Sequence, residues 1–101
     1  MKVEKEKMEV TVKFIGVFRS ISGKSNLNLK FKDTTPIRKA VKKIVEELPK
    51  LKRVLIDPEL EDPRPNTLIL VNGREINILN GLETVLKDGD QVVFVPVLHG
   101  G

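Results

Sequence analysis

Residues 35–49 read TPIRKAVKKIVEELP, and this segment decides the fold. Its apolar residues recur at the spacing that places them on one face of a helix. The apolar positions are Ile37, Ala40, Val41, Ile44, Val45 and Leu48. Thr35 is expected to cap the helix, Pro36 to occupy its first position, and Pro49 to end it near Leu48. One amphipathic helix needs one sheet to cover its apolar face, which predicts an α+β domain.

Alternating apolar residues predict two strands before this helix. Val10, Val12 and Phe14 occupy alternate positions, and we expect the strand that begins at residue 9 to run to Phe18. Residues 27–31 repeat the alternation after a polar segment whose composition is typical of a turn. The two strands are therefore expected to pair as an antiparallel hairpin.

After the helix, the pattern predicts three more strands. They are expected at residues 67–71, 74–78 and 91–98. Asn72-Gly73 is a strong signal for a tight turn between the first two. Three prolines predict a loop over 57–66, and 80–86 is expected to form a turn or a brief helix. The order strand, strand, helix, strand, short strand, strand predicts a ubiquitin-like β-grasp fold, in which a mixed four- to five-stranded sheet packs on one main helix.

The chain of 101 residues is long enough for one domain. Residues 1–8 are mixed in charge and lack periodicity, so we expect a flexible charged extension there. The β-grasp domain is expected over 9–96, and residues 97–101 are expected to form an extended C-terminal tail.

The composition excludes several classes of function. The chain has no cysteine, so a disulfide, a thiolate metal site and a nucleophilic thiol are excluded, and any sulfur must come from a partner. The four aromatic residues are all Phe and the formal charge is only +4, so nucleic acid is not expected as a partner. No apolar run is long enough to span a membrane, and the charged N-terminus does not resemble a signal peptide. A cytoplasmic location is therefore expected.

Gly100-Gly101 ends the sequence. Two glycines without side chains allow a terminal carboxylate to pass through a narrow channel and reach another enzyme. The alternative is a frayed end, because glycine is common there and termini are usually poorly ordered. The pair alone favours function only weakly.

Four patches of the chain resemble a known family. They are Phe14-Ile15-Gly16-Val17-Phe18-Arg19 followed by Gly23, Val71-Asn72-Gly73, Leu86-Lys87-Asp88-Gly89-Asp90-Gln91-Val92, and Phe94-Val95-Pro96 closing in Gly100-Gly101. In this order and spacing, from about residue 9 to 101, they resemble the MoaD/ThiS group of ubiquitin-like sulfur carriers. They also resemble ubiquitin-related modifiers and small archaeal modifier proteins. Leu98-His99 stands where MoaD-like tails usually carry small residues, which is closer to the ubiquitin-related modifiers.

The resemblance implies that the C-terminal carboxylate of Gly101 is the reacting group. Gly100, His99 and Leu98 would thread it into an adenylating activating enzyme, which uses ATP and its metal to activate the carboxylate before a thiocarboxylate forms. A MoaE-like large synthase subunit would then use the sulfur, which makes this chain the small subunit of molybdopterin synthase in molybdenum or tungsten cofactor biosynthesis. No cofactor is expected on the chain itself.

Two other functions stay open. The first is a protein modifier that is conjugated through Gly101 to lysine-bearing target proteins, or that serves as a sulfur donor for tRNA thiolation. The second is a non-catalytic β-grasp binding module whose glycines are incidental. The sequence has no glycine-rich phosphate loop and no nucleophile–base pair, so catalytic machinery of its own is not expected and its status as an enzyme is left open.

The last predicted strand is apolar on both faces. One helix covers only one face of a sheet, so the other face is expected to expose apolar residues to a partner, unless a loop covers it. We assign the partner-docking residues as Phe94, Val95, Pro96 and Val97. His99 is the only histidine and has no second ligand near it in sequence, so no metal site is expected.

Overall fold

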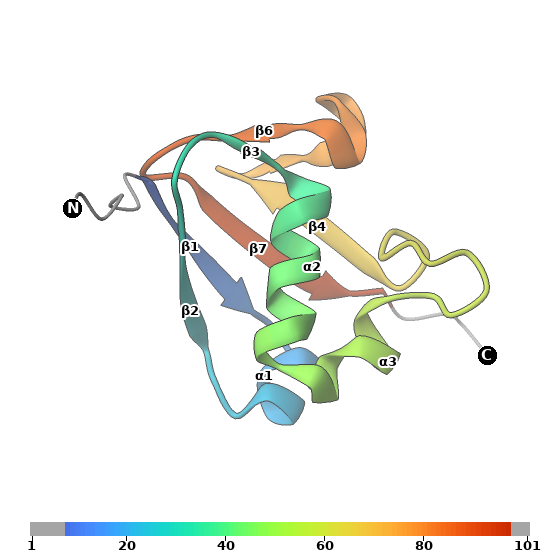
Figure 1. Ribbon diagram of the computed structural model, residues 1–101. Helices are drawn as coiled ribbons and strands as arrows, with labels where there is room; N and C mark the ends of the chain where they lie inside the picture. Colours follow the sequence, from blue (N-terminus) through green and yellow to red (C-terminus); the bar gives the residue numbers. More distant parts are fainter. Residues whose placement is uncertain (1–7, 98–101) are drawn as a thin grey trace.

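The computed structural model describes residues 8–97, which form a mixed five-stranded sheet with helices on one face (Figure 1). The strand order is β2-β1-β7-β4-β5. The strands are β1 (Met8–Phe14), β2 (Asn26–Phe31), β4 (Thr67–Val71), β5 (Arg74–Glu75) and β7 (Gln91–Pro96). β1 and β7 are parallel, whereas the other neighbours are antiparallel. This arrangement confirms the predicted α+β architecture.

The long helix α2 (Ile37–Glu47) crosses the sheet and supplies one side of the core. Four residues of its predicted apolar stripe are buried, Ile37, Ala40, Val41 and Ile44, and the last has no exposed surface, whereas Val45 and Leu48 are half-buried. On the sheet, Phe14 of β1 lies opposite Phe94 of β7, and their rings stack with centroids 6.2 Å apart. Shorter helices close the lower end of the core: α1 (Val17–Ser22), η1 (Pro49–Leu51) and α3 (Lys52–Leu55).

The predicted N-terminus of the long helix is wrong by one residue, because α2 begins at Ile37 and Pro36 takes the cap position. Thr35 and Pro36 form a short strand, β3 (Thr35–Pro36), which pairs with β6 (Val85–Leu86) in a separate two-stranded sheet. Thr35 is buried and makes no side-chain cap, and the Ile37 N–H donates to the Thr84 carbonyl instead (2.9 Å). A tertiary strand pairing therefore takes the place of the local cap.

The predicted continuation of the first strand to Phe18, and the turn after it, are also wrong. The strand ends at Phe14, and Gly16 adopts φ 58° and ψ −129°, which turns the chain into α1. Phe18 is only 1% exposed, so this short helix places an aromatic side chain in the core. The spacing of Phe18 and Ile21 is helical, a signal that the strand prediction overlooked.

Three boundaries differ from the predictions by smaller amounts. Met8 is the first residue of β1 and is buried, so it does not belong to the charged extension; residues 1–7 lie outside the described part of the chain. The short return strand ends at Glu75, whose side chain accepts the Asn77 N–H and starts η2 (Ile76–Ile78). The last strand ends at Pro96 rather than at residue 98.

Hydrogen bonds join the Asn72-Gly73 turn to the Asp88-Gly89-Asp90 turn at one end of the sheet. Asn72, which has φ 50°, donates through Nδ2 to Asp90 Oδ1 (2.9 Å), and its Oδ1 accepts the Gln91 N–H (2.9 Å). Asp90 Oδ2 accepts the Lys87 N–H, and Asp88 Oδ1 accepts the Glu9 N–H, both at 2.8 Å. These side chains satisfy backbone donors where strands end, which gives the Asn-Gly and Asp-Gly-Asp motifs a structural function.

The brief helix expected in residues 80–86 is present as η3 (Gly81–Glu83). Loop 57–66 is irregular apart from a single bridge between Asp57 and Asp62. Within residues 8–97, no helix is long and apolar enough to cross a membrane.

Candidate functional site

The candidate site begins at Pro96 and Val97, where the chain leaves the sheet. We call these two residues the tail root. The Val97 N–H donates to the Asn66 carbonyl (2.9 Å), which continues the pairing of β7 with β4. On the other side, the Ile15 N–H donates to the Phe94 carbonyl (3.2 Å), and Pro96 has no N–H to extend the pairing with β1. Among the described residues, the backbone hydrogen bond of the tail root is therefore made on the β4 side of the strand, to Asn66, which precedes β4.

Gly16 packs directly against the tail root. A Cβ atom added to Gly16 would lie 3.2 Å from Pro96 Cγ, which is closer than ordinary van der Waals contact. The positive φ of Gly16 also disfavours any residue with a side chain. Gly16, from the first patch of the family resemblance, therefore allows Pro96, from the last patch, to pack beside it.

The predicted reacting group, the Gly101 carboxylate, lies outside the described residues, as do Gly100, His99 and Leu98. Their predicted threading function therefore stays a prediction. The covalent geometry alone sets an upper limit on reach: residues 97–101 can span at most about 17 Å, at ~3.4 Å per residue.

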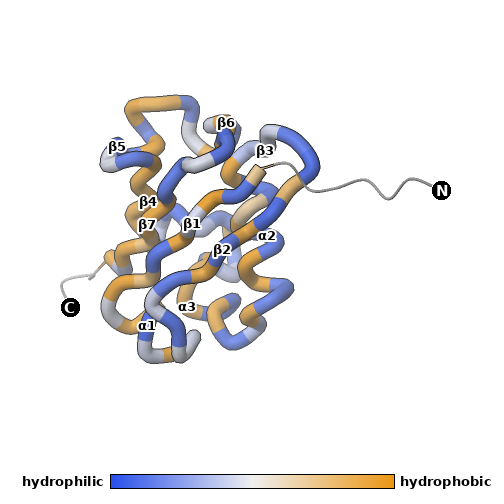
Figure 2. Tube along the Cα trace, turned by 90° about the vertical axis from the view of Figure 1, so that its left-hand side faces the viewer, coloured by the Kyte–Doolittle hydropathy of each residue, from blue (hydrophilic) through white to orange (hydrophobic). Residues whose placement is uncertain are grey.

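The sheet face opposite α2 carries a partly exposed apolar surface. The alternation of buried and accessible positions places Leu68 and Leu70 of β4 on this face, directly paired with Val95 and Val93 of β7. Leu68 is 36% and Val97 40% exposed, and the other three are half-buried. We call Leu68, Leu70, Val93, Val95 and Val97 the outer apolar patch. Figure 2 shows the apolar segments of β4 and β7 beside each other.

The structure separates the four predicted docking residues. Val95 and Val97 belong to the outer apolar patch, and Pro96 is half-buried near Gly16. Phe94 is fully buried and stacks on Phe14, so its side chain packs in the core and does not face a partner. The prediction missed Leu68 and Leu70, because their place beside Val95 and Val93 depends on the register between β4 and β7.

Loop 57–66 supports the tail root from the side of β4. Arg64 Nε and Nη2 donate to the Asp62 carboxylate at 3.0 and 2.6 Å, and these hydrogen bonds hold the pKa of Asp62 below its ordinary value. The same interaction raises the pKa of Arg64. The Asn66 N–H then donates to the Pro63 carbonyl (3.0 Å), which places the Asn66 carbonyl for Val97.

The two aspartates of this loop accept hydrogen bonds from its own backbone. Asp57 Oδ1 accepts the N–H groups of Glu59 and Leu60, each at 2.9 Å, and Asp62 Oδ1 accepts the Arg64 N–H (2.8 Å). Across residues 8–97, no three His, Cys, Asp or Glu side chains gather in a way that could hold a metal ion.

The β-grasp sheet places the chain in the class of small ubiquitin-like proteins. Comparison with known proteins gives the family: the model for Urm1 (Ubiquitin related modifier) matches residues 9–101. The chain belongs to this family, and the resemblance to ubiquitin-like sulfur carriers and modifiers is confirmed.

Individual relatives agree with this family. The chain is 30% identical over 95 residues to small archaeal modifier protein 3 of Haloferax volcanii. This alignment covers 93% of this chain and 100% of the relative. The solution structure of small archaeal modifier protein 1 from Methanosarcina acetivorans superposes with a TM-score of 0.79 at 30% identity, covering 93% and 97% of the two chains. A chain in the complex of subunits 1 and 2 of the molybdopterin-converting factor from Helicobacter pylori gives 0.58 at 28% identity, with 93% and 100% covered. These neighbours confirm the ubiquitin-like fold.

Proposed function

We propose that this protein is a sulfur carrier whose C-terminal Gly101 carboxylate is activated by a partner enzyme and converted to a thiocarboxylate. The observation that carries the proposal is the family match, which extends through the Gly-Gly end to Gly101. The fold supports it, because the tail root fixes where the last four residues begin.

The proposed chemistry has two steps. A carboxylate at neutral pH is ionised and resists nucleophiles, since its pKa is about 3.5. In the first step, a Gly101 carboxylate oxygen attacks the α-phosphorus of ATP, pyrophosphate leaves, and an acyl adenylate forms. In the second, sulfide attacks the carbonyl carbon and AMP leaves, so that Gly101 becomes a thiocarboxylate. If a persulfide attacks instead, a thiol must then reduce the resulting acyl disulfide.

The protein contributes position rather than acid–base groups to this chemistry. The tail delivers the carbonyl carbon while the folded domain stays outside the enzyme, and the absence of Cβ atoms at Gly100 and Gly101 keeps the required channel narrow. The outer apolar patch, next to the tail root, is the surface we propose for docking to the adenylating enzyme. ATP and its metal would belong to that partner.

We propose two candidate acceptors. The first is a large synthase subunit that builds the dithiolene of molybdopterin; the Helicobacter pylori complex of molybdopterin-converting factor subunits favours it. The second is a lysine amine of a target protein, which attacks the activated carbonyl to form an isopeptide bond. The relation to small archaeal modifier protein 3 and the Leu98-His99 pair favour this second candidate.

An exchange assay tests the shared first step. An activating enzyme from the same cells is incubated with this protein, ATP and labelled pyrophosphate, and incorporation of label into ATP reports reversible adenylation. We expect exchange with the full chain and none after deletion of Gly101. Exchange that is equally fast without Gly101 would contradict the proposal. Branched peptides in which Gly101 is joined to a target lysine would then assign the modifier branch, and dithiolene formation by a large synthase subunit would assign the other.

A further inference from the structure

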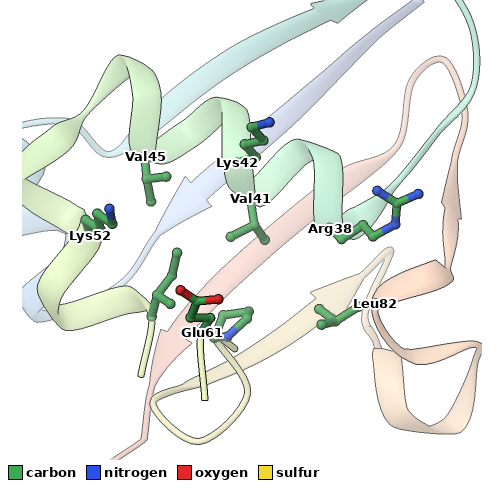
Figure 3. A pocket seen from close by; sticks show the side chains of 9 residues that line it. Arg38, Val41, Lys42, Val45, Lys52, Glu61 and Leu82 are labelled. Carbon is green, nitrogen blue, oxygen red and sulfur yellow. The ribbon is translucent and has the colours of Figure 1, made fainter. Parts of the chain in front are cut away.

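A groove on the helix side of the molecule has no part in the chemistry proposed above (Figure 3). It runs between α2 and loop 57–66 and has a volume of about 440 Å³, which is in the range of binding sites. Apolar side chains from α2, from the chain after α3 and from η3 line it: Val41, Val45, Ile56, Pro63 and Leu82. Three of these, Val45, Ile56 and Leu82, are half-buried and therefore accessible to a ligand.

The groove continues past the end of α3. A second hollow, of about 380 Å³, shares Lys52, Ile56 and Glu61 with the first. We call the two hollows together the helix-side groove. An elongated groove of this kind suits a segment of polypeptide better than a compact small molecule, because a chain segment can follow its length.

Positive charge surrounds the apolar lining. Four cationic side chains contribute to the groove: Arg38, Lys42, Lys52 and Arg53. Arg38 pairs with Glu83 at 2.9 Å. Across residues 8–97, the side chains of Lys42, Lys52 and Arg53 take part in no hydrogen bond or ion pair.

The negative charge in the groove is smaller. Glu61 and Asp57 are its two carboxylates, and Asp57 accepts the backbone N–H groups of its own loop. Figure 3 shows Glu61 across the groove from Val41, with Lys42 on α2 and Lys52 at the start of α3, at one end of the groove. The groove lining therefore carries three cations without partners and one exposed carboxylate, that of Glu61, so the groove is complementary to an anionic ligand with apolar side chains.

The groove is separated from the outer apolar patch by the sheet itself. α2 covers one face of the sheet, and the patch lies on the other. Two hydrogen bonds nevertheless connect the groove to the tail root: the Asn66 N–H donates to the carbonyl of Pro63, a groove residue, and the Asn66 carbonyl accepts the Val97 N–H. A protein bound here would thus lie on the loop that supports the tail root, while the opposite sheet face stays open to an activating enzyme.

We propose that the helix-side groove docks an acidic segment of a partner protein. The segment inserts apolar side chains between α2 and loop 57–66, and its carboxylates pair with Lys42 and Lys52. A nucleic acid backbone would satisfy the cations but would leave polar groups against the apolar lining, which is unfavourable. Residues 1–7 of this chain carry three lysines and two glutamates, so they do not supply a complementary negative charge.

A display library of random dodecapeptides, selected on the full-length protein, tests this proposal. We expect enriched peptides that combine Asp or Glu with Leu, Ile, Val or Phe, and whose binding perturbs the amide NMR signals of Val45, Ile56 and Leu82. The variant K42E/K52E should weaken binding of the enriched peptides by at least roughly tenfold. The variant K39E/K50E changes the net charge equally, at exposed residues that do not line the groove, and should stay within about twofold.

Several results would overturn the proposal. Enrichment of neutral or basic peptides, no enrichment, perturbations on the outer apolar patch, or full binding to K42E/K52E would each contradict it. K42A/K52A serves the same purpose should the charge reversal prevent folding. If deletion of residues 98–101 alone reproduces the perturbations in the groove, the chain's own tail occupies it and the partner is excluded. None of these readouts depends on the chemistry of Gly101, so the two proposals can fail separately.

Discussion

Replacing Gly16 with alanine tests how the tail root is held. Gly16 has φ 58° and ψ −129°, a conformation that L-residues adopt only with strain of about 1–3 kcal/mol. The new Cβ would also lie 3.2 Å from Pro96 Cγ, so the proline ring or the strand must shift. The lower entropy of alanine in the unfolded chain offsets about 0.4–1 kcal/mol.

The expected loss for G16A is therefore about 2–3 kcal/mol of unfolding free energy. For a domain of this size, roughly 4–8 °C of melting temperature is lost per kcal/mol, so we expect a decrease of about 10–20 °C. Thermal and urea unfolding monitored by circular dichroism measure both quantities. G23A is the matched control: Gly23 also has a positive φ, 73°, but nothing lies within 4 Å of its added Cβ. G23A should lose about 1 kcal/mol.

A double-mutant cycle with P96A isolates the contact. If the packing of Pro96 on Gly16 matters, the cost of G16A should fall by about 0.5–1 kcal/mol in the P96A background, because the clashing Cγ is gone. A loss for G16A no larger than that for G23A, or an unchanged loss in the P96A background, would refute the reasoning.

Three further predictions concern the docking surface, the loop and the core. L68D and V95D each place a charge on the outer apolar patch and should raise the KM for activation by roughly tenfold. N28D, at an exposed position of β2, should leave the KM unchanged. Pyrophosphate exchange measures the KM, and equal KM values for N28D and the patch variants would exclude the patch as the docking surface. Because the pKa of Asp62 is lowered, its interaction with Arg64 stabilises the fold fully above the unfolded pKa of about 3.9, and this contribution disappears as the pH falls through the lowered pKa. R64A should return the pKa of Asp62 to its ordinary value in a carboxyl NMR titration. An unchanged pKa in R64A would contradict the pairing. I44A removes a side chain with no exposed surface and should lower the unfolding free energy by about 2–5 kcal/mol in urea, whereas a loss below about 1 kcal/mol would mean that α2 is not packed as described.

The features that could be predicted from the sequence have a local cause. The stripe of α2 is visible because helical periodicity alone decides which side chains are buried. The Asn72-Gly73 turn was predictable for the same reason, since its backbone requirement lies within the motif.

Apart from α1, whose helical spacing is local, the features that were missed depend on distant residues. Thr35 can cap a helix or pair with a strand, and only the position of Leu86 decides between them. Phe94 and Val95 are neighbours in an apolar strand, so alternation cannot say which one faces the core until α2 and Phe14 are in place. The helix-side groove depends on how loop 57–66 folds back toward α2, for which the sequence has no periodic signal.

The most direct test of the central claim is the mass of the C-terminal fragment of the protein. The protein is incubated with its activating enzyme, ATP and sulfide, and the intact chain is then fragmented in a mass spectrometer. The account predicts that the terminal fragment ends at Gly101 and that one carboxyl oxygen is replaced by sulfur. A fragment whose Gly101 keeps both oxygens while the enzyme consumes ATP, or a fully active protein that continues beyond Gly101, would contradict it.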